Sequence, residues 1–202
     1  MKSKQQKRFN LALLLLLAMS WVAGCSKGYT FHGTLNDPPK PAVAVTGTNW
    51  DEKPFHLRDQ QGKVVVAFFG YTYCPDVCPL TLANMNEVYQ KLGDKVQDVA
   101  FVFISTDPAR DTPKRLATYI AAFNTHFYGI NIPDNDLAAV KQGFGVYSAK
   151  NTTAPNQTAE NYFVDHTGYV YLIDQQGQWR VTYPYDVPID EVVADVEHLL
   201  AG

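Results

Sequence analysis

The sequence has little charge and few cysteines, and both features limit the classes of protein to which it can belong. Charged residues make up 18% of the 202 residues and the net charge is −3, whereas hydrophobic residues make up 46%. This composition supplies enough apolar surface for a core, which excludes a disordered chain, and the negative net charge argues against binding to nucleic acid. Three cysteines are too few for a disulfide-stapled miniprotein. The length fits one domain with a tail.

Common catalytic and membrane-spanning signatures are missing as well. The sequence contains no glycine-rich phosphate loop and no Ser-His-Asp order with a nucleophile elbow. The apolar run near the N-terminus, residues 11–19, is too short to span a bilayer on its own. These absences argue against a nucleotide-binding protein and a serine hydrolase.

The first 25 residues have the layout of an export signal. Four basic residues within positions 2–8 precede the apolar run, and small residues at 22–24 lead into Cys25. The segment resembles the bacterial lipobox, which implies cleavage before Cys25 and a lipid on its sulfur. The alternative is an uncleaved anchor in which Cys25 is an ordinary residue. Both predict an exported protein held at a membrane and facing the periplasm or the cell exterior.

We predict three parts along the chain. Residues 1–24 form the signal peptide, residues 25–45 hold the acylated cysteine and a flexible tether, and residues 46–202 form the domain. The tether prediction rests on scattered glycines and prolines with little apolar periodicity. Loss of residues 1–24 would remove four positive charges and no negative ones, changing the net charge from −3 to −7.

Apolar patterning in the domain predicts alternating strands and helices. Continuous apolar runs at 64–69 and 99–104 indicate strands buried on both faces, and apolar residues at helical spacing indicate helices over 82–92, 116–123 and 189–200. Further elements are expected as a strand over 128–132, a helix over 134–144, a polar loop over 148–161, and strands over 162–164, 169–173 and 179–183. This order predicts an α/β, thioredoxin-like fold, with a central mixed sheet flanked by helices, an inserted strand–helix unit and a late β-hairpin.

Cys74 and Cys78 lie where the first buried strand leads into a helix, the end of an open α/β sheet at which ligands bind. Pro75 is expected in the first helical turn, with Cys74 near the N-cap, so a spacing of four places both sulfurs on one side. The positive helix N-terminus favours thiolates. Three readings stay open at this point: a redox pair, a Cu(I) site and a structural disulfide. The three-residue gap departs from the two-residue gap of thioredoxin-type oxidoreductases.

Three segments, in this order, resemble the Sco/SenC family. They are Gly-Tyr-Thr-Tyr-Cys-Pro-Asp-Val-Cys-Pro at 70–79, Asp-Pro-x-x-Asp at 107–111, and Asp-His-Thr-Gly at 165–168. The resemblance covers about residues 45–200. It implies that Cys74 and Cys78 bind copper, as Cu(I) or Cu(II), through thiolates and that His166 is the third ligand. It also implies a partner, the cytochrome c oxidase subunit that carries the binuclear copper centre.

Two acidic residues are predicted to tune this site. Asp165 is expected to orient the His166 ring, as carboxylates do in many metal sites. Asp107 follows the second buried strand and is expected close to the sulfurs, with turn capping as the alternative. Arg110 and Asp111 are expected to be a local ion pair and a helix-start charge.

Three functions follow from these residues, and the fold cannot choose among them. The first is a membrane-anchored copper metallochaperone. The second is a thiol–disulfide oxidoreductase that keeps the oxidase's copper-ligand cysteines reduced, and the third is a redox-defence or sensing role. Other copper carriers or thiol reductases are further expected partners. Zn²⁺ accepts the same ligand types, although the affinity order favours copper. His166 distinguishes a copper site from a dithiol exchanger, because the exchanger has no obligatory use for a distant imidazole.

Overall fold

The computed structural model describes residues 28–202 except 154, 156 and 159. Phe31–Gly202 forms one compact unit. The predicted signal peptide and Cys25 lie outside the described residues. In the described ranges, no helix is both long enough and apolar enough to cross a membrane.

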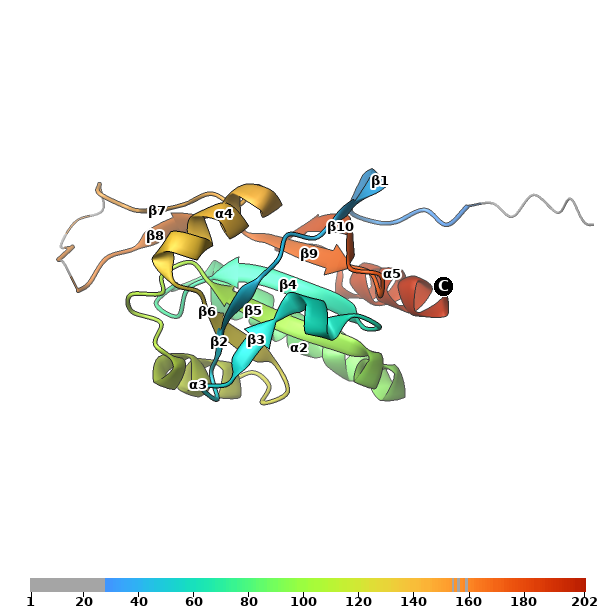
Figure 1. Ribbon diagram of the computed structural model, residues 1–202, viewed down its shortest axis with the longest axis horizontal. Helices are drawn as coiled ribbons and strands as arrows, with labels where there is room; N and C mark the ends of the chain where they lie inside the picture. The colour runs from blue at the N-terminus through green and yellow to red at the C-terminus, as the bar shows by residue number, and fades with distance from the viewer. Residues whose placement is uncertain (1–27, 154, 156, 159) are drawn as a thin grey trace, which may run out of the picture. The chain divides into compact units, whose positions relative to one another are not determined.

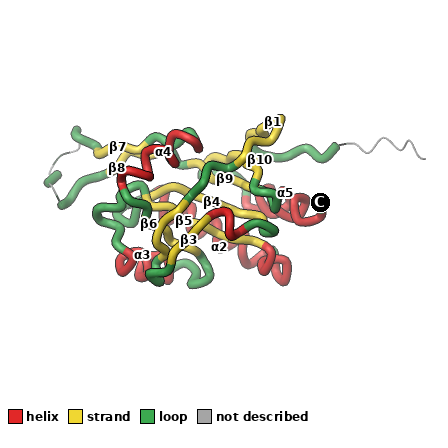
Figure 2. Tube along the Cα trace, in the orientation of Figure 1, coloured by secondary structure: helices red, strands yellow, loops and turns green. Residues whose placement is uncertain are grey.

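A mixed sheet of eight strands forms the centre of this unit (Figures 1 and 2). Its strands are β1 (Thr34–Pro41), β2 (Thr46–Asn49), β3 (Pro54–His56), β4 (Val64–Gly70), β5 (Val99–Ser105), β6 (Tyr128–Asn131), β9 (Tyr169–Ile173) and β10 (Gln178–Pro184). They lie in the order β1-β10-β9-β4-β5-β6-β2-β3. Strands β4, β5 and β6 are parallel, and the other neighbours are antiparallel.

Helices cover both faces of the sheet. The described part of the chain contains α2 (Val77–Lys91), α3 (Pro113–Ala121), α4 (Asp134–Phe144) and α5 (Ile189–Ala201), with short 3-10 helices η1 (Leu57–Gln60) and η2 (Gly93–Asp98). Helix α4 lies on one side of the sheet, and α2, α3 and α5 lie on the other (Figure 1).

Alternation along β4 separates two hydrophobic cores. Val64, Val66 and Phe68 pack with α2, α3 and α5, whereas Val65 and its alternate neighbours Ala67 and Phe69 pack with α4. Every residue of β4 and β5 is buried, as the continuous apolar runs predict. Together with the β9–β10 hairpin, this confirms the predicted α/β architecture, a central mixed sheet flanked by helices.

The linker prediction is wrong for residues 34–41, which form the edge strand β1 and pair with β10. An edge strand tolerates prolines because one side of its backbone needs no partner. Seven of the eight residues of β1 are exposed, so the strand has no apolar pattern to detect. Upstream of β1, the N–H of His32 donates to the Asp195 carboxylate on α5 (3.0 Å), and its Nδ1 lies 2.7 Å from the same group.

A second, two-stranded sheet contains one strand, β7, from the segment expected to be a loop. β7 (Ser148–Lys150) pairs antiparallel with β8 (Val164–His166). The strand expected over 162–164 therefore lies two residues later, and His166 is the last residue of β8. Strands of three residues are too short to produce a periodic pattern, which explains the error.

Candidate functional site

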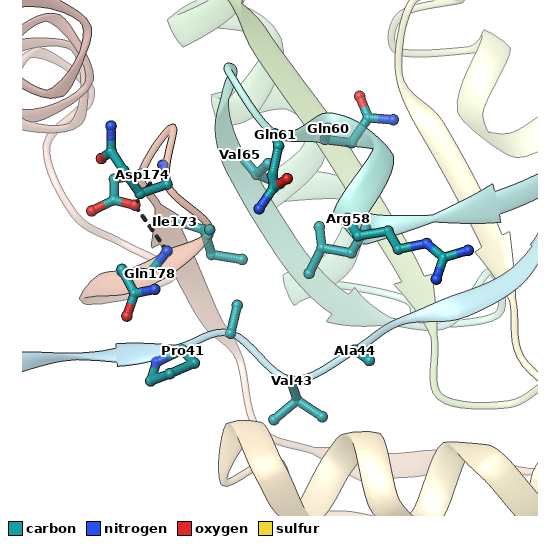
Figure 3. A pocket seen from close by; sticks show the side chains of 14 residues that line it. Pro41, Val43, Ala44, Arg58, Gln60, Gln61, Val65, Ile173, Asp174 and Gln178 are labelled. Carbon is teal, nitrogen blue, oxygen red and sulfur yellow. Dashed lines mark hydrogen bonds between the residues drawn. The ribbon is translucent and has the colours of Figure 1, made fainter.

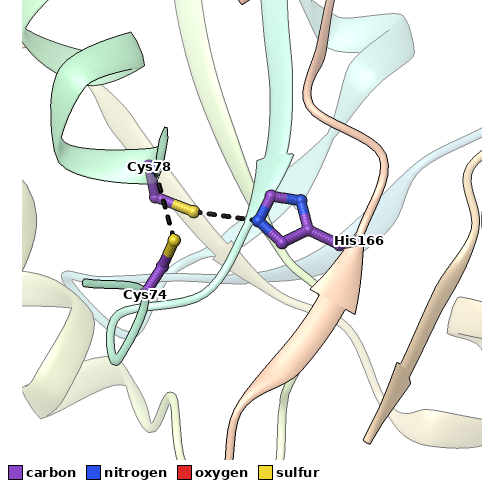
Figure 4. A group of neighbouring side chains, drawn as sticks. All are labelled: Cys74, Cys78 and His166. Carbon is purple, nitrogen blue, oxygen red and sulfur yellow. Dashed lines mark hydrogen bonds between the residues drawn. The ribbon is translucent and has the colours of Figure 1, made fainter. Parts of the chain in front are cut away.

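Cys74, Cys78 and His166 converge at the C-terminal end of β4 (Figure 4). The two sulfurs and a ring nitrogen of His166 all lie within 4.8 Å of one another. The Sγ of Cys78 is 3.2 Å from Nε2 of His166, and the Cys78 N–H donates to the Sγ of Cys74 at 3.4 Å. Both cysteines are free thiols. Cys78 is buried, whereas Cys74 and His166 are partly exposed, so the group can be reached from solvent.

The turn that carries Cys74 differs from the prediction, because helix α2 begins at Val77 and not at Pro75. Pro79 supplies the reason. In a helix beginning at Pro75, Pro79 would fall in the fifth position, where it lacks the N–H that the Pro75 carbonyl needs. Beginning at Val77 places Pro79 in the first turn, where no such bond is required. Cys74 therefore lies in a turn closed by its N–H to the Tyr71 carbonyl (3.2 Å), and only Cys78 is helical.

Gly70, the last residue of β4, lets the Cys78 sulfur approach the sheet. A Cβ at this position would lie 2.7 Å from the Cys78 sulfur and 2.9 Å from the rings of Phe68 and Phe103. These neighbours are buried, so a larger residue would displace the sulfur. Gly70 stands inside the family-like segment, but its role as a spacer becomes visible only in three dimensions.

The His166 ring is oriented by the backbone and by neighbouring rings. Its Nδ1 lies 3.0 Å from the Thr167 carbonyl, which suits donation from Nδ1–H and turns Nε2 toward Cys78. Tyr71 meets the ring edge-on at 5.6 Å between centroids. The prediction that Asp165 orients this ring is wrong, because the Asp165 carboxylate accepts from the Asn151 amide at 3.0 and 3.1 Å. Successive strand residues point to opposite faces, which turns Asp165 away from its neighbour.

The two thiols have opposite pKa shifts. The hydrogen bond from Cys78, with help from His166 and nearby backbone groups, lowers the pKa of Cys74 to about 4 despite partial burial. Burial raises the pKa of Cys78, and the adjacent Cys74 thiolate raises it further. The site thus presents one accessible thiolate beside one buried thiol.

The two acidic residues after β5 make different contacts, and it is Asp111 that reaches the turn that carries Cys74. Arg110 pairs with Asp107 and not with Asp111, and the Tyr162 hydroxyl donates to Asp107 at 2.8 Å. Asp111 is buried and accepts from the Thr72 N–H (3.1 Å), the Thr72 hydroxyl (2.6 Å) and the Ser105 hydroxyl (2.6 Å). Burial raises the pKa of Asp111. Asp111 therefore holds the turn that carries Cys74, because the parallel pairing of β4 and β5 places the segments after them side by side.

We expect Asp111→Ala to lower the free energy of unfolding by about 2 kcal/mol, because three buried donors lose their acceptor. Urea denaturation followed by tryptophan fluorescence measures the change. Asp59→Ala is the matched control, since this carboxylate on η1 is largely exposed. It should alter stability by less than about 0.5 kcal/mol. Equal effects of the two substitutions would contradict the role assigned to Asp111.

A separate pocket of about 270 Å³ lies at the opposite end of β4 (Figure 3). Val65, near the start of the strand, lines it together with Arg58 and Gln61. Asp174, also in its wall, accepts from the Gln178 N–H at 2.8 Å and pairs with Arg180 at 3.1 Å. None of the predicted site residues lines this pocket, so it is distinct from the cysteine–histidine group.

Comparisons with known proteins agree with this geometry. The sequence model of the SCO1/SenC family matches residues 43–201. A SCO2-like protein of Rickettsia felis is 32% identical over 193 residues, covering 89% of this chain and 93% of the relative.

Solved structures of similar proteins share the fold. The chain resembles Bradyrhizobium japonicum ScoI with copper bound, with a TM-score of 0.71 and 32% identity over 79% of this chain and 99% of that one. A SCO1/SenC family lipoprotein from Bacillus anthracis matches with a TM-score of 0.69 and 28% identity, covering 80% and 95% of the two chains.

Proposed function

The chain belongs to the SCO1/SenC family, and from this membership we propose that it is a copper metallochaperone. It binds one copper ion through Cys74, Cys78 and His166 and delivers the ion to the cytochrome c oxidase subunit that carries the binuclear copper centre. The observation that supports this most is the convergence of two sulfurs and one imidazole nitrogen within 4.8 Å.

The ligand chemistry suits copper. Two thiolates favour the soft Cu(I) ion, and an imidazole completes a three-ligand set; Cu(II) would take a further ligand or water. With metal bonds of about 2.3 Å to sulfur and about 2.0 Å to nitrogen, the ligand atoms of one ion lie at most about 4.6 Å apart, so small side-chain movements suffice. Copper in the Bradyrhizobium japonicum relative favours this metal over zinc.

A carrier must also release its cargo. Cys74 and His166 are partly exposed, so a recipient's ligands can approach the ion from that side and replace them one at a time. Anchoring through a lipid on Cys25 would hold the domain at the membrane, on the side where it faces an integral-membrane oxidase. The Bacillus anthracis lipoprotein of this family supports that arrangement.

The opposite properties of the two thiols favour thiol–disulfide exchange as a second candidate function. The accessible Cys74 thiolate attacks a partner's disulfide, forming a mixed disulfide and releasing one partner sulfur as a thiolate. Cys78 then loses its proton and attacks the Cys74 sulfur, which releases the partner's other sulfur. The partner gains two electrons, and Cys74 and Cys78 end as a disulfide.

Anaerobic titration of the reduced full-length protein with Cu(I), and then with Cu(II), tests the proposal. We expect one copper per chain, and transfer of that copper to the metal-free copper domain of the oxidase subunit. Transfer is measured by the appearance of the binuclear centre's absorption. A protein that binds no copper tightly but reduces that domain's disulfide would overturn the metallochaperone and establish the oxidoreductase.

A further inference from the structure

Arg110 touches both segments that supply the cysteine–histidine group. It lies in the turn between β5 and α3, outside the group itself. Its side chain is only 10% exposed and pairs with Asp107 in the same turn. Its guanidinium lies close to the thiol turn, residues 71–74, and to the chain leading into β8.

On the histidine side, Arg110 holds Tyr162, two residues before β8. The guanidinium carbon lies 3.5 Å from the centre of the Tyr162 ring. Nη1 donates to the Tyr162 carbonyl at 2.8 Å. The Tyr162 hydroxyl donates in turn to Asp107, the ion-pair partner of Arg110. One residue thus fixes both the backbone and the ring of the segment that leads to His166.

On the thiol side, the same guanidinium lies over the tyrosines beside Cys74. It is 4.6 Å from the centre of the Tyr73 ring and 5.8 Å from that of Tyr71. Tyr73 is adjacent to Cys74 in sequence, and Tyr71 accepts the Cys74 N–H and meets the His166 ring edge-on. Arg110 therefore bridges the two ligand-bearing segments without contributing a ligand atom.

The energetics of Arg110 suit positioning better than stability. Its Nη2 is buried and has no hydrogen-bond partner among the described groups, which is costly for a charged donor. Burying an ion pair seldom stabilises a protein relative to apolar residues of the same volume. What this arrangement supplies is a defined separation between Tyr162 and Tyr73, and through them between His166 and Cys74.

We propose that Arg110 is a positioning residue that sets the distance between the His166 ring and the thiol turn. The expected effect of Arg110 on copper affinity rests on the proposed copper site. Its expected effect on the position of the His166 segment does not, and can be measured in the metal-free protein. Loss of a partner that orients a metal ligand typically costs ten- to a hundredfold in metal affinity. Arg110 should act through His166 and should add nothing once that imidazole is gone.

A double-mutant cycle tests this in the full-length protein. We expect Arg110→Met to lower Cu(II) affinity by about tenfold and to have no further effect in a His166→Ala background. Arg115→Met is the matched control near the site. Arg115 also lies over the Tyr73 ring, at 4.5 Å, and donates to Thr72, but its described contacts are with the thiol turn. The factors by which Arg115→Met and His166→Ala each lower Cu(II) affinity should multiply in the double variant, because the two residues act independently. Equal coupling of Arg110 and Arg115 to His166 would overturn the proposal.

Amide hydrogen exchange of the metal-free protein gives a readout that is independent of copper. We expect Arg110→Met to speed exchange in β7 and β8 by about tenfold while leaving β4 and β5 unchanged, because local opening needs only the contacts it breaks. Arg180→Met, which removes the partly exposed ion-pair partner of the buried Asp174 at the other end of the sheet, should leave β7 and β8 unchanged. A uniform rise across the fold, or no rise, would overturn the proposal even if the protein binds no copper.

Arg110→Lys covers the case in which Arg110→Met does not fold. Lysine keeps a positive charge opposite Asp107 but lacks the planar fork that reaches the Tyr162 carbonyl and stacks on its ring. We expect the same local rise in exchange and the same coupling to His166. Wild-type behaviour of Arg110→Lys would show that charge alone suffices and would contradict the bridging role.

Discussion

Replacing Cys74 or Cys78 by serine should abolish tight copper binding. A serine hydroxyl is a hard ligand that stays protonated at neutral pH, so it cannot replace a thiolate on Cu(I). We expect affinity to fall by about a thousandfold or more, beyond the ten- to hundredfold cost of losing an outer partner. Competition against a Cu(I) chelator under anaerobic conditions measures the change.

Both cysteine variants should fold while losing copper, although Cys78 is the more buried of the two. Cys74 is partly exposed, so Cys74→Ser should leave folding unaffected. Cys78 is buried with its sulfur 3.2 Å from Nε2 of His166, and a serine there can keep a hydrogen bond to the ring. Cys25→Ser is the matched control, because it removes the remaining cysteine of the chain and should not alter copper affinity. Retention of tight binding in either site variant would contradict a two-thiolate site.

Replacing His166 by alanine should weaken copper binding but spare the dithiol. We expect Cu(II) affinity to fall by about a hundredfold, and Cu(I) affinity by less, because Cu(I) is satisfied chiefly by thiolates whereas Cu(II) prefers nitrogen and oxygen ligands. The thiolate-to-Cu(II) absorption band should shift and weaken. A redox titration against glutathione should still show a reversible Cys74–Cys78 couple.

His126→Ala is the control for this experiment. His126 is exposed and stacks on Tyr89, so its loss should leave the band and the affinity unchanged. Unchanged copper affinity in His166→Ala would remove this histidine from the site. Because a dithiol exchanger does not require the imidazole, comparing copper affinity with exchange rate in this variant assigns each activity to its residues.

Local patterns in the sequence were sufficient for the main elements. The apolar runs of β4 and β5 and the helical spacing on α5 are properties of neighbouring residues, so periodicity reveals them. The cysteine turn could also be located, since it follows a buried strand and precedes a helix. The start of helix α2 at Val77 differs from the prediction because Pro79 lacks the N–H that a helix beginning at Pro75 would need.

The tertiary structure alone decided how the site is assembled and supported. His166 lies 88 residues from Cys78, and it reaches the sulfurs on a three-residue strand that has no period to detect. Asp111 and Arg110 acquire their roles from contacts with Thr72, Tyr73 and Tyr162, which depend on the parallel pairing of β4 with β5 and on the path of the chain before β8. Sequence determined which ligand chemistry is present, because residue types carry it. Long-range packing determined which charged groups orient those ligands, because such contacts join segments whose separation along the chain holds no local signal.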